Sequence, residues 1–151
     1  MKKVMILILL LVLSFSVLSC GKKENVAEGV PTIRYNDVPL EVYTINVYKT
    51  NGNIAIGGNE TAADHVKQNA SRVPFTEISD GRIELVNGSD TDVSYNILFS
   101  GLFDENGELL GYTENALSTL PSGRYIICAQ VSERKAEFSS VYVYMAGIDK
   151  K

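Results

Sequence analysis

The sequence predicts an all-β fold, a sandwich of about seven to nine antiparallel strands in residues 32–151. Short runs rich in β-branched and aromatic residues alternate between apolar and polar positions, which is typical of half-buried strands. Turn signals with Gly, Asn, Asp and Pro separate these runs at regular spacing, as in sandwiches. Only residues 60–68 fit a helix, for which Asn59 is the expected N-cap.

The expected strands lie on both sides of that helix. Before it, Asn51-Gly52 predicts a tight hairpin, because Asn-Gly favours the backbone angles of a type I′ turn. After it, Asp104-Glu105-Asn106-Gly107 predicts a second hairpin, and Leu117–Leu120 leads into a Pro121-Ser122-Gly123 turn. The expected strand residues are 33–35, 40–48, 54–56, 75–78, 82–86, 93–103, 108–112, 124–131 and 138–148.

The last two expected strands carry a resemblance. Leu120-Pro121-Ser122-Gly123-Arg124-Tyr125-Ile126-Ile127, then the charged turn Glu133-Arg134-Lys135 and Val141-Tyr142-Val143-Tyr144, is similar to the end of bacterial immunoglobulin-like modules. The resemblance implies an immunoglobulin-like sandwich. It departs from antibody-type domains, which need a Trp and a paired Cys, since this chain has no Trp. It also implies that one face of the strand points into the core, namely Tyr125, Ile127, Ala129 and Val131.

The N-terminus has the three zones of a secretory signal. Lys2 and Lys3 precede an apolar run from Val4 to Leu13 that extends to Leu18, and the chain turns polar after Gly21. The run is shorter than the roughly 20 residues that a membrane-spanning helix needs. We therefore expect residues 1–19 to be a cleaved signal peptide, with a permanent membrane anchor as the open alternative.

Within this signal, Val17-Leu18-Ser19-Cys20 resembles the lipobox of bacterial lipoproteins. Ser19 and Cys20 match its two most restrictive positions, whereas Leu18 is bulkier than usual. The resemblance implies that Cys20 receives a diacylglycerol with fatty acids such as palmitate, becomes the new N-terminus and binds the membrane. The protein would then lie in the bacterial cell envelope, facing away from the cytoplasm; the inner membrane, the outer membrane and the membrane of a one-membrane cell all stay open. Residues 20–31 read as the lipidated Cys20 and a flexible tether.

Composition supports one acidic domain. The chain has 14 basic and 18 acidic residues, and removal of Lys2 and Lys3 with the signal leaves a net charge of about −6. Such a surface argues against nucleic acid as a partner. The second cysteine, Cys128, lies in an apolar run and is expected to be a small buried side chain.

No pattern of reactive residues suggests an enzyme. His65 is the only histidine and is expected at the surface, because no nucleophile or metal-ligand motif accompanies it. The acidic pairs Asp90/Asp92, Asp104/Glu105 and Glu77/Asp80 fall short of a dedicated calcium loop. We therefore expect no catalytic, cofactor or metal site.

The sequence favours a non-catalytic binding module. Tyr142 and Tyr144 share one face of the final strand, and they form an exposed aromatic binding strip if the Val face packs inward. Otherwise they cover the outer face or belong to the buried set. The ligand would be a protein or a glycan. The alternative function is inhibition of secreted proteases through the loop Asn87–Thr91 or Leu117–Gly123, and the oligomeric state stays open.

Overall fold

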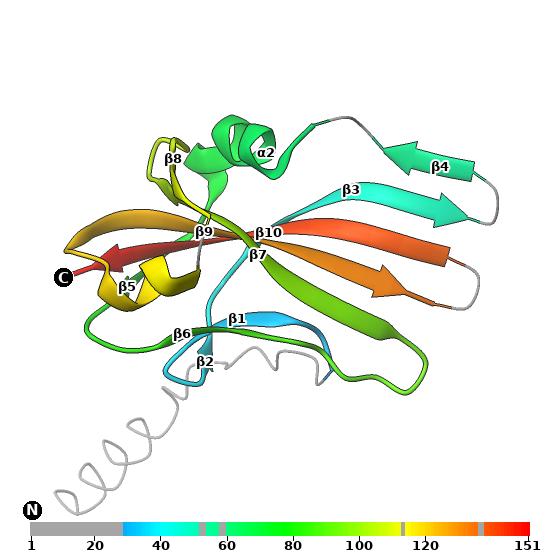
Figure 1. Cartoon of the computed structure of the whole chain (residues 1–151), viewed down its shortest axis with the longest axis horizontal. Coiled ribbons are helices and arrows are strands. Elements are labelled where there is room, and N and C mark those ends of the chain that lie inside the picture. Colours follow the sequence, from blue (N-terminus) through cyan, green and yellow to red (C-terminus); the bar gives the residue numbers. More distant parts are fainter. Residues whose placement is uncertain (1–28, 52–53, 58–59, 113, 136–137) are drawn as a thin grey trace, which may run out of the picture.

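The computed structural model describes residues 29–151 except 52–53, 58–59, 113 and 136–137. In this part the chain forms two stacked β-sheets with one short α-helix (Figure 1), which confirms the predicted all-β sandwich. The strands are β1 Thr32–Tyr35, β2 Val38–Pro39, β3 Tyr43–Asn51, β4 Ile54–Gly57, β5 Phe75–Ile78, β6 Ile83–Val86, β7 Ser94–Asp104, β8 Leu109–Gly111, β9 Gly123–Arg134 and β10 Phe138–Lys150.

The two sheets differ in size. The small sheet has the order β2-β1-β6, and the large sheet has the order β4-β3-β10-β9-β7-β8. The pairs within this order are antiparallel, as predicted, but β5 pairs with β10 in parallel. β3 pairs with β10 as far as Met145 and β5 from Gly147, so two strands share one edge of β10 in succession. The expectation of an entirely antiparallel sandwich is therefore wrong for β5.

The central part of the large sheet, around β9 and β10, is buried on both faces. Ile127, Ala129 and Val131 lie in the cluster that faces the small sheet, with Tyr125 packed against it, as the resemblance implies. Ile126 and Cys128 point to the opposite face and are equally buried. Strands covered on both sides read as nearly continuous apolar runs, which explains the composition of β9.

The opposite face is covered by helix α2 (Ala62–Asn69) and the 3₁₀-helix η1 (Ala70–Arg72). Val66 and Ala70 from these helices pack on Phe103 and Met145 of the sheet. The predicted helix is thus confirmed, but its N-cap is Thr61, not Asn59. Thr61 and Asp64 form a reciprocal capping box, which satisfies backbone N–H groups at the start of the helix.

Two turns of the sandwich are held by hydrogen bonds between residues that are close in sequence. Asp104 Oδ1 accepts from the backbone N–H groups of Asn106 and Glu108, each at 2.9 Å, which confirms the predicted β7–β8 turn. The Tyr125 hydroxyl donates to the carbonyl of Pro121, four residues upstream, at 3.2 Å. This is the geometry of a tyrosine corner, a feature of immunoglobulin-type sandwiches. The Leu117–Leu120 segment contributes to the 3₁₀-helix η2 (Glu114–Thr119).

Two expectations about exposure are wrong. His65 is buried on α2, where its Nδ1 is 3.5 Å from Glu60. Pro31, expected at the end of the tether, is fully buried, and Gly29 already lies against Ser89. The packed domain therefore begins by Gly29, while Cys20 and the signal lie outside the described residues. No helix in the described part is long and apolar enough to span a bilayer.

Candidate binding groove beside strand β6

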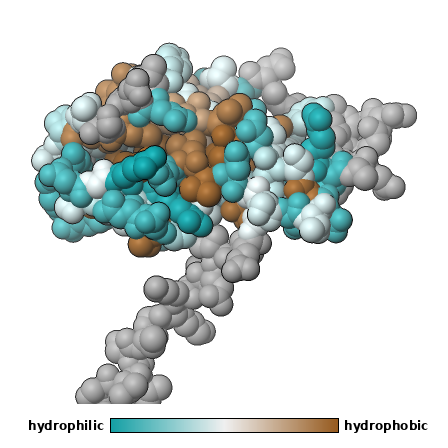
Figure 2. Space-filling view, turned by 60° about the horizontal axis from the view of Figure 1, so that its bottom comes forward, coloured by the Kyte–Doolittle hydropathy of each residue, from teal (hydrophilic) through white to brown (hydrophobic). Residues whose placement is uncertain are grey.

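The described surface is hollowed along β6, opposite the 3₁₀-helix η2. This β6 groove has a volume of about 550 Å³ and is lined by Gly81, Arg82, Ile83, Glu84, Leu85, Glu114 and Leu117. In the view that brings the lower side of Figure 1 forward, hydrophobic surface gathers across the middle of the molecule and is flanked by hydrophilic side chains (Figure 2). A concave, partly apolar surface with a few polar groups is the usual form of a binding site.

One side of the groove is an open strand edge. β6 is the last strand of the small sheet, and it pairs only with β1 among the described strands. Leu40 N–H donates to the Ile33 carbonyl at 2.8 Å, so the backbone of Ile33 faces β2 and not β6. Leu85 is paired with Ile33, and its backbone groups therefore also face away from β1. Because backbone groups alternate in direction along a strand, the N–H and C=O groups of Ile83 also point away from β1.

The start of β6 is fixed on its paired side. The Asn36 side chain accepts from Arg82 N–H at 2.9 Å, and Asn36 N–H donates to the Arg82 carbonyl at the same distance. Asn36 and Asp37 form the turn between β1 and β2, with φ angles of 46° and 66°. These left-handed angles are those of a type I′ turn, in which Asn and Asp are favoured. The open edge thus begins beside a rigid hairpin.

The charges at the groove are predominantly acidic. Arg82 forms an ion pair with Glu84 on the neighbouring strand position, with 2.6 Å between Nε and Oε1. Glu114, on η2, is exposed and forms no ion pair within the described part of the chain. A bound ligand therefore meets one carboxylate that is already paired and one that is available.

The far end of the groove is held by the predicted loop Leu117–Gly123. Leu117 and Leu120 are buried, and the Lys150 ammonium donates to the Leu120 carbonyl at 2.6 Å. The same ammonium lies 3.3 Å from the Asp80 carboxylate. These contacts fix the loop against the C-terminal strand. Inhibition of a protease through Leu117–Gly123 or Asn87–Thr91 stays a prediction.

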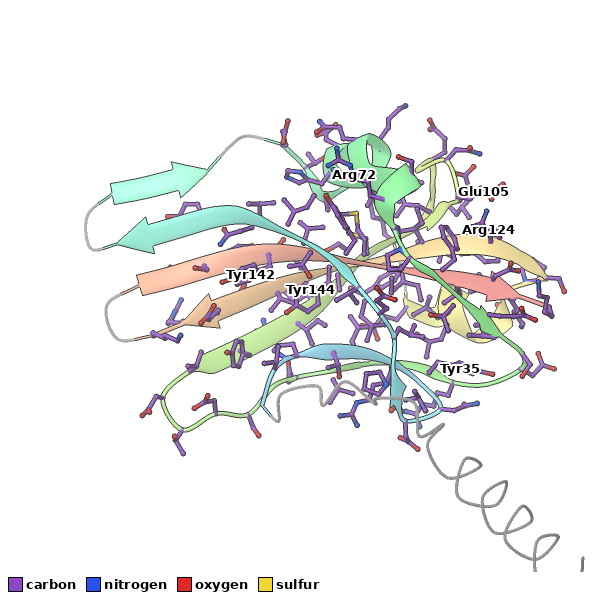
Figure 3. The ribbon with its side chains drawn as sticks, turned by 180° about the vertical axis from the view of Figure 1, so that it is seen from behind. Tyr35, Arg72, Glu105, Arg124, Tyr142 and Tyr144 are labelled. Atoms are coloured by element: carbon purple, nitrogen blue, oxygen red, sulfur yellow. The ribbon has the colours of Figure 1, made fainter. Side chains whose placement is uncertain are left out.

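The structure places Tyr142 and Tyr144 on the face of the large sheet that meets the small sheet (Figure 3). Both are half-buried against that core, because the small sheet covers their face while Val143 and Met145 pack beneath α2. The aromatic strip of Tyr142 and Tyr144 is therefore partly covered by the small sheet, and not exposed as expected. Burial raises the pKa of both hydroxyls; at Tyr142 the hydrogen bond to Glu133, 2.8 Å long, adds to this effect.

The Tyr142 hydroxyl is connected through Glu133 to Lys135, which lines a second hollow. Glu133, itself buried, accepts from Tyr142 and lies 2.9 Å from the Lys135 ammonium, whose pKa this hydrogen bond raises. Lys135 also lines a hollow of about 660 Å³ that includes residues 88–95 and Arg134. The structure thus brings the predicted loop Asn87–Thr91 and the Tyr142 region to one end of the sandwich, away from the η2 end of the β6 groove.

Acidic residues for which no metal site is expected lie in turns and loops. Asp104 holds the β7–β8 turn, and Asp90 accepts from Asp92 N–H at 3.1 Å within its own loop. Among the described residues, no three His, Cys, Asp or Glu side chains lie close enough together to hold a metal ion.

Cys128 is completely buried, as predicted, and burial raises the pKa of its thiol to about 12. At pH 8 only about one thiol in ten thousand is then ionised, and the thiolate is the reactive form. We expect Ellman's reagent to leave Cys128 unmodified in the folded protein and to titrate it fully in guanidinium chloride. Rapid reaction without denaturant would contradict the burial.

The groove residues Ile83, Leu85 and Glu114 are not among the predicted site residues, whereas Leu117 begins the predicted loop Leu117–Gly123. Residues 82–86 were expected to form a strand, and they do, but nothing local in the sequence marks that strand as an open edge. Comparison of the chain with protein-family models, with curated proteins and with solved structures finds no match.

Proposed function

We propose that this protein is a lipid-anchored, non-catalytic binding module of the bacterial cell envelope, and that its ligand is a protein. The anchoring part rests on Cys20, which lies where an apolar signal meets a polar segment. From Cys20 to Gly29, the first described residue, nine residues span at most about 30 Å. A diacylated Cys20 would thus keep the sandwich close to the membrane surface.

The observation that supports binding is the β6 groove. It joins an unpaired strand edge to apolar side chains, whereas the Tyr142 and Tyr144 rings are partly covered. Exposed strand edges are sites where sandwiches take up other polypeptides, because unpaired backbone groups attract a further strand. This favours a protein over a glycan as the ligand.

Site-specific photo-crosslinking in intact cells tests this function. A benzoylphenylalanine at position 114, on the groove, is expected to give a discrete crosslinked product with an envelope protein. The same group at Asn96, which is exposed on the opposite face of the large sheet, serves as the matched control and is expected to give none. Absence of any product at position 114, or identical products at both positions, would contradict the proposal.

A further inference from the structure

We propose, on the basis of the function above, that the β6 groove binds an extended peptide segment as an added β-strand. The segment carries apolar side chains at alternate positions and a Lys or Arg beside them. This assigns the ligand class and the manner of binding, and it names the backbone groups that make the contact.

The backbone of β6 supplies the first argument. The N–H and C=O groups of Ile83 and Leu85 point away from β1, and no described strand pairs with them. Residues two apart on a strand lie roughly 7 Å from one another, which is the spacing at which an added strand makes its hydrogen bonds. Only another extended polypeptide offers donors and acceptors at this repeat. The edge therefore favours a peptide over a compact small molecule.

The side chains supply the second argument. Ile83 and Leu85 are half-buried against the core between the sheets, and Leu117 of η2 forms the opposite apolar side of the groove. Alternate side chains of an added strand point to the same face of the sheet. Those that point toward η2 would contact Leu117 and the inner sides of Ile83 and Leu85. The intervening side chains would face solvent, as Glu84 does.

The charges select the composition of the segment. Glu84 is already paired with Arg82, but the exposed Glu114 carboxylate has no ion pair in the described part of the chain. A Lys or Arg of the segment would provide its counter-ion, and the acidic domain as a whole would attract a basic segment. A second copy of β6 is disfavoured, since it would bring another Glu84 and Glu114 to the same place. Like charges across an interface oppose pairing.

Amide hydrogen exchange of the full mature protein, followed by NMR, tests the edge directly. In the free protein, the amides of Ile83 and Leu85 are expected to exchange much faster than those of Glu84 and Val86, which face β1. The probe is a synthetic peptide of alternating Val and Ser in which one Lys replaces a Val, so that its ammonium points to the same face as the Val side chains. On its addition, exchange at Ile83 and Leu85 is expected to slow at least tenfold, while Glu84 and Val86 change little.

Fluorescence anisotropy with the same labelled peptide separates backbone pairing from simple adhesion. Methylation of two alternate backbone nitrogens, which removes donors and keeps the side chains, is expected to weaken binding at least tenfold. Glu114→Lys is expected to weaken binding about threefold to tenfold at low salt. The matched control Glu41→Lys reverses an exposed charge outside the groove lining and should leave binding unchanged.

The outcomes distinguish the inference from the proposed function. Equal binding of the methylated peptide, or slowed exchange only outside β6, would reject strand addition. If crosslinks form at position 114 but the peptide does not bind, strand addition is rejected and the proposed binding function is retained. If there is neither a crosslink at position 114 nor peptide binding, both strand addition and the proposed binding function are rejected. Slow exchange at Ile83 and Leu85 in concentrated protein without peptide, together with dimers in sedimentation, would assign the edge to a second copy and overturn the inference.

Discussion

Replacement of Cys20 by Ser is expected to abolish incorporation of radiolabelled palmitate into this protein in growing cells. The thiol is the only group in the Val17-Leu18-Ser19-Cys20 segment that can form the thioether to diacylglycerol, and a serine hydroxyl does not replace it. Two acyl chains, at about 0.8 kcal/mol for each buried methylene, make membrane attachment effectively permanent. The wild type is therefore expected to carry the label and the variant none.

The other cysteine supplies the control for this experiment. Cys128→Ser should label like the wild type, because Cys128 is buried in the sandwich and carries no lipid in this proposal. Mass spectrometry of the N-terminal peptide should find a chain that begins at a diacylated Cys20. Label in the Cys20→Ser variant, or a wild-type chain with an uncut leader, would contradict lipid anchoring and with it the assignment to the envelope.

Phe103→Ala is expected to lower the free energy of unfolding by about 3–5 kcal/mol. Phe103 is fully buried beneath α2, and its ring lies against the space beside Gly101. Truncation would remove contacts with Val66 and the core of β9 and β10, and would leave a cavity that the packed sheet cannot fill by collapse. Chemical denaturation monitored by circular dichroism measures the change.

The control for Phe103 comes from the same strand. Leu98 is 54% exposed, so Leu98→Ala should change the free energy of unfolding by no more than about 0.5 kcal/mol. Similar losses for the two variants would show that the face beneath α2 is not the packed core that the structure describes.

Much of the sandwich follows from local signals in the chain. The resemblance of the β9 segment implied which of its side chains point into the core, and Asp104 to Gly107 predicted the β7–β8 turn. Such signals act over a few residues: a turn residue fixes its own backbone angles, and alternation fixes a face. The Asn36-Asp37 turn carries the same kind of signal, although it is not among the predicted turns.

Other features depend on partners that are distant in sequence. His65 was expected at the surface because its neighbours are polar, yet this side chain is buried on α2. The sequence left open which face of the final strand packs inward. In the structure the small sheet covers the face that carries Tyr142 and Tyr144. The parallel pairing of β5 with β10 also joins segments about 70 residues apart, which no local pattern encodes.

By itself, the sequence determined the strands, most of their turns, the burial of Cys128 and the expectation of a lipidated Cys20. Only the tertiary structure decided that β6 ends the small sheet and that η2 faces its unpaired edge across a groove. The reason is physical: turn and strand preferences act between near neighbours in the chain, whereas the strand that ends a sheet is set by pairing between segments that are distant in sequence.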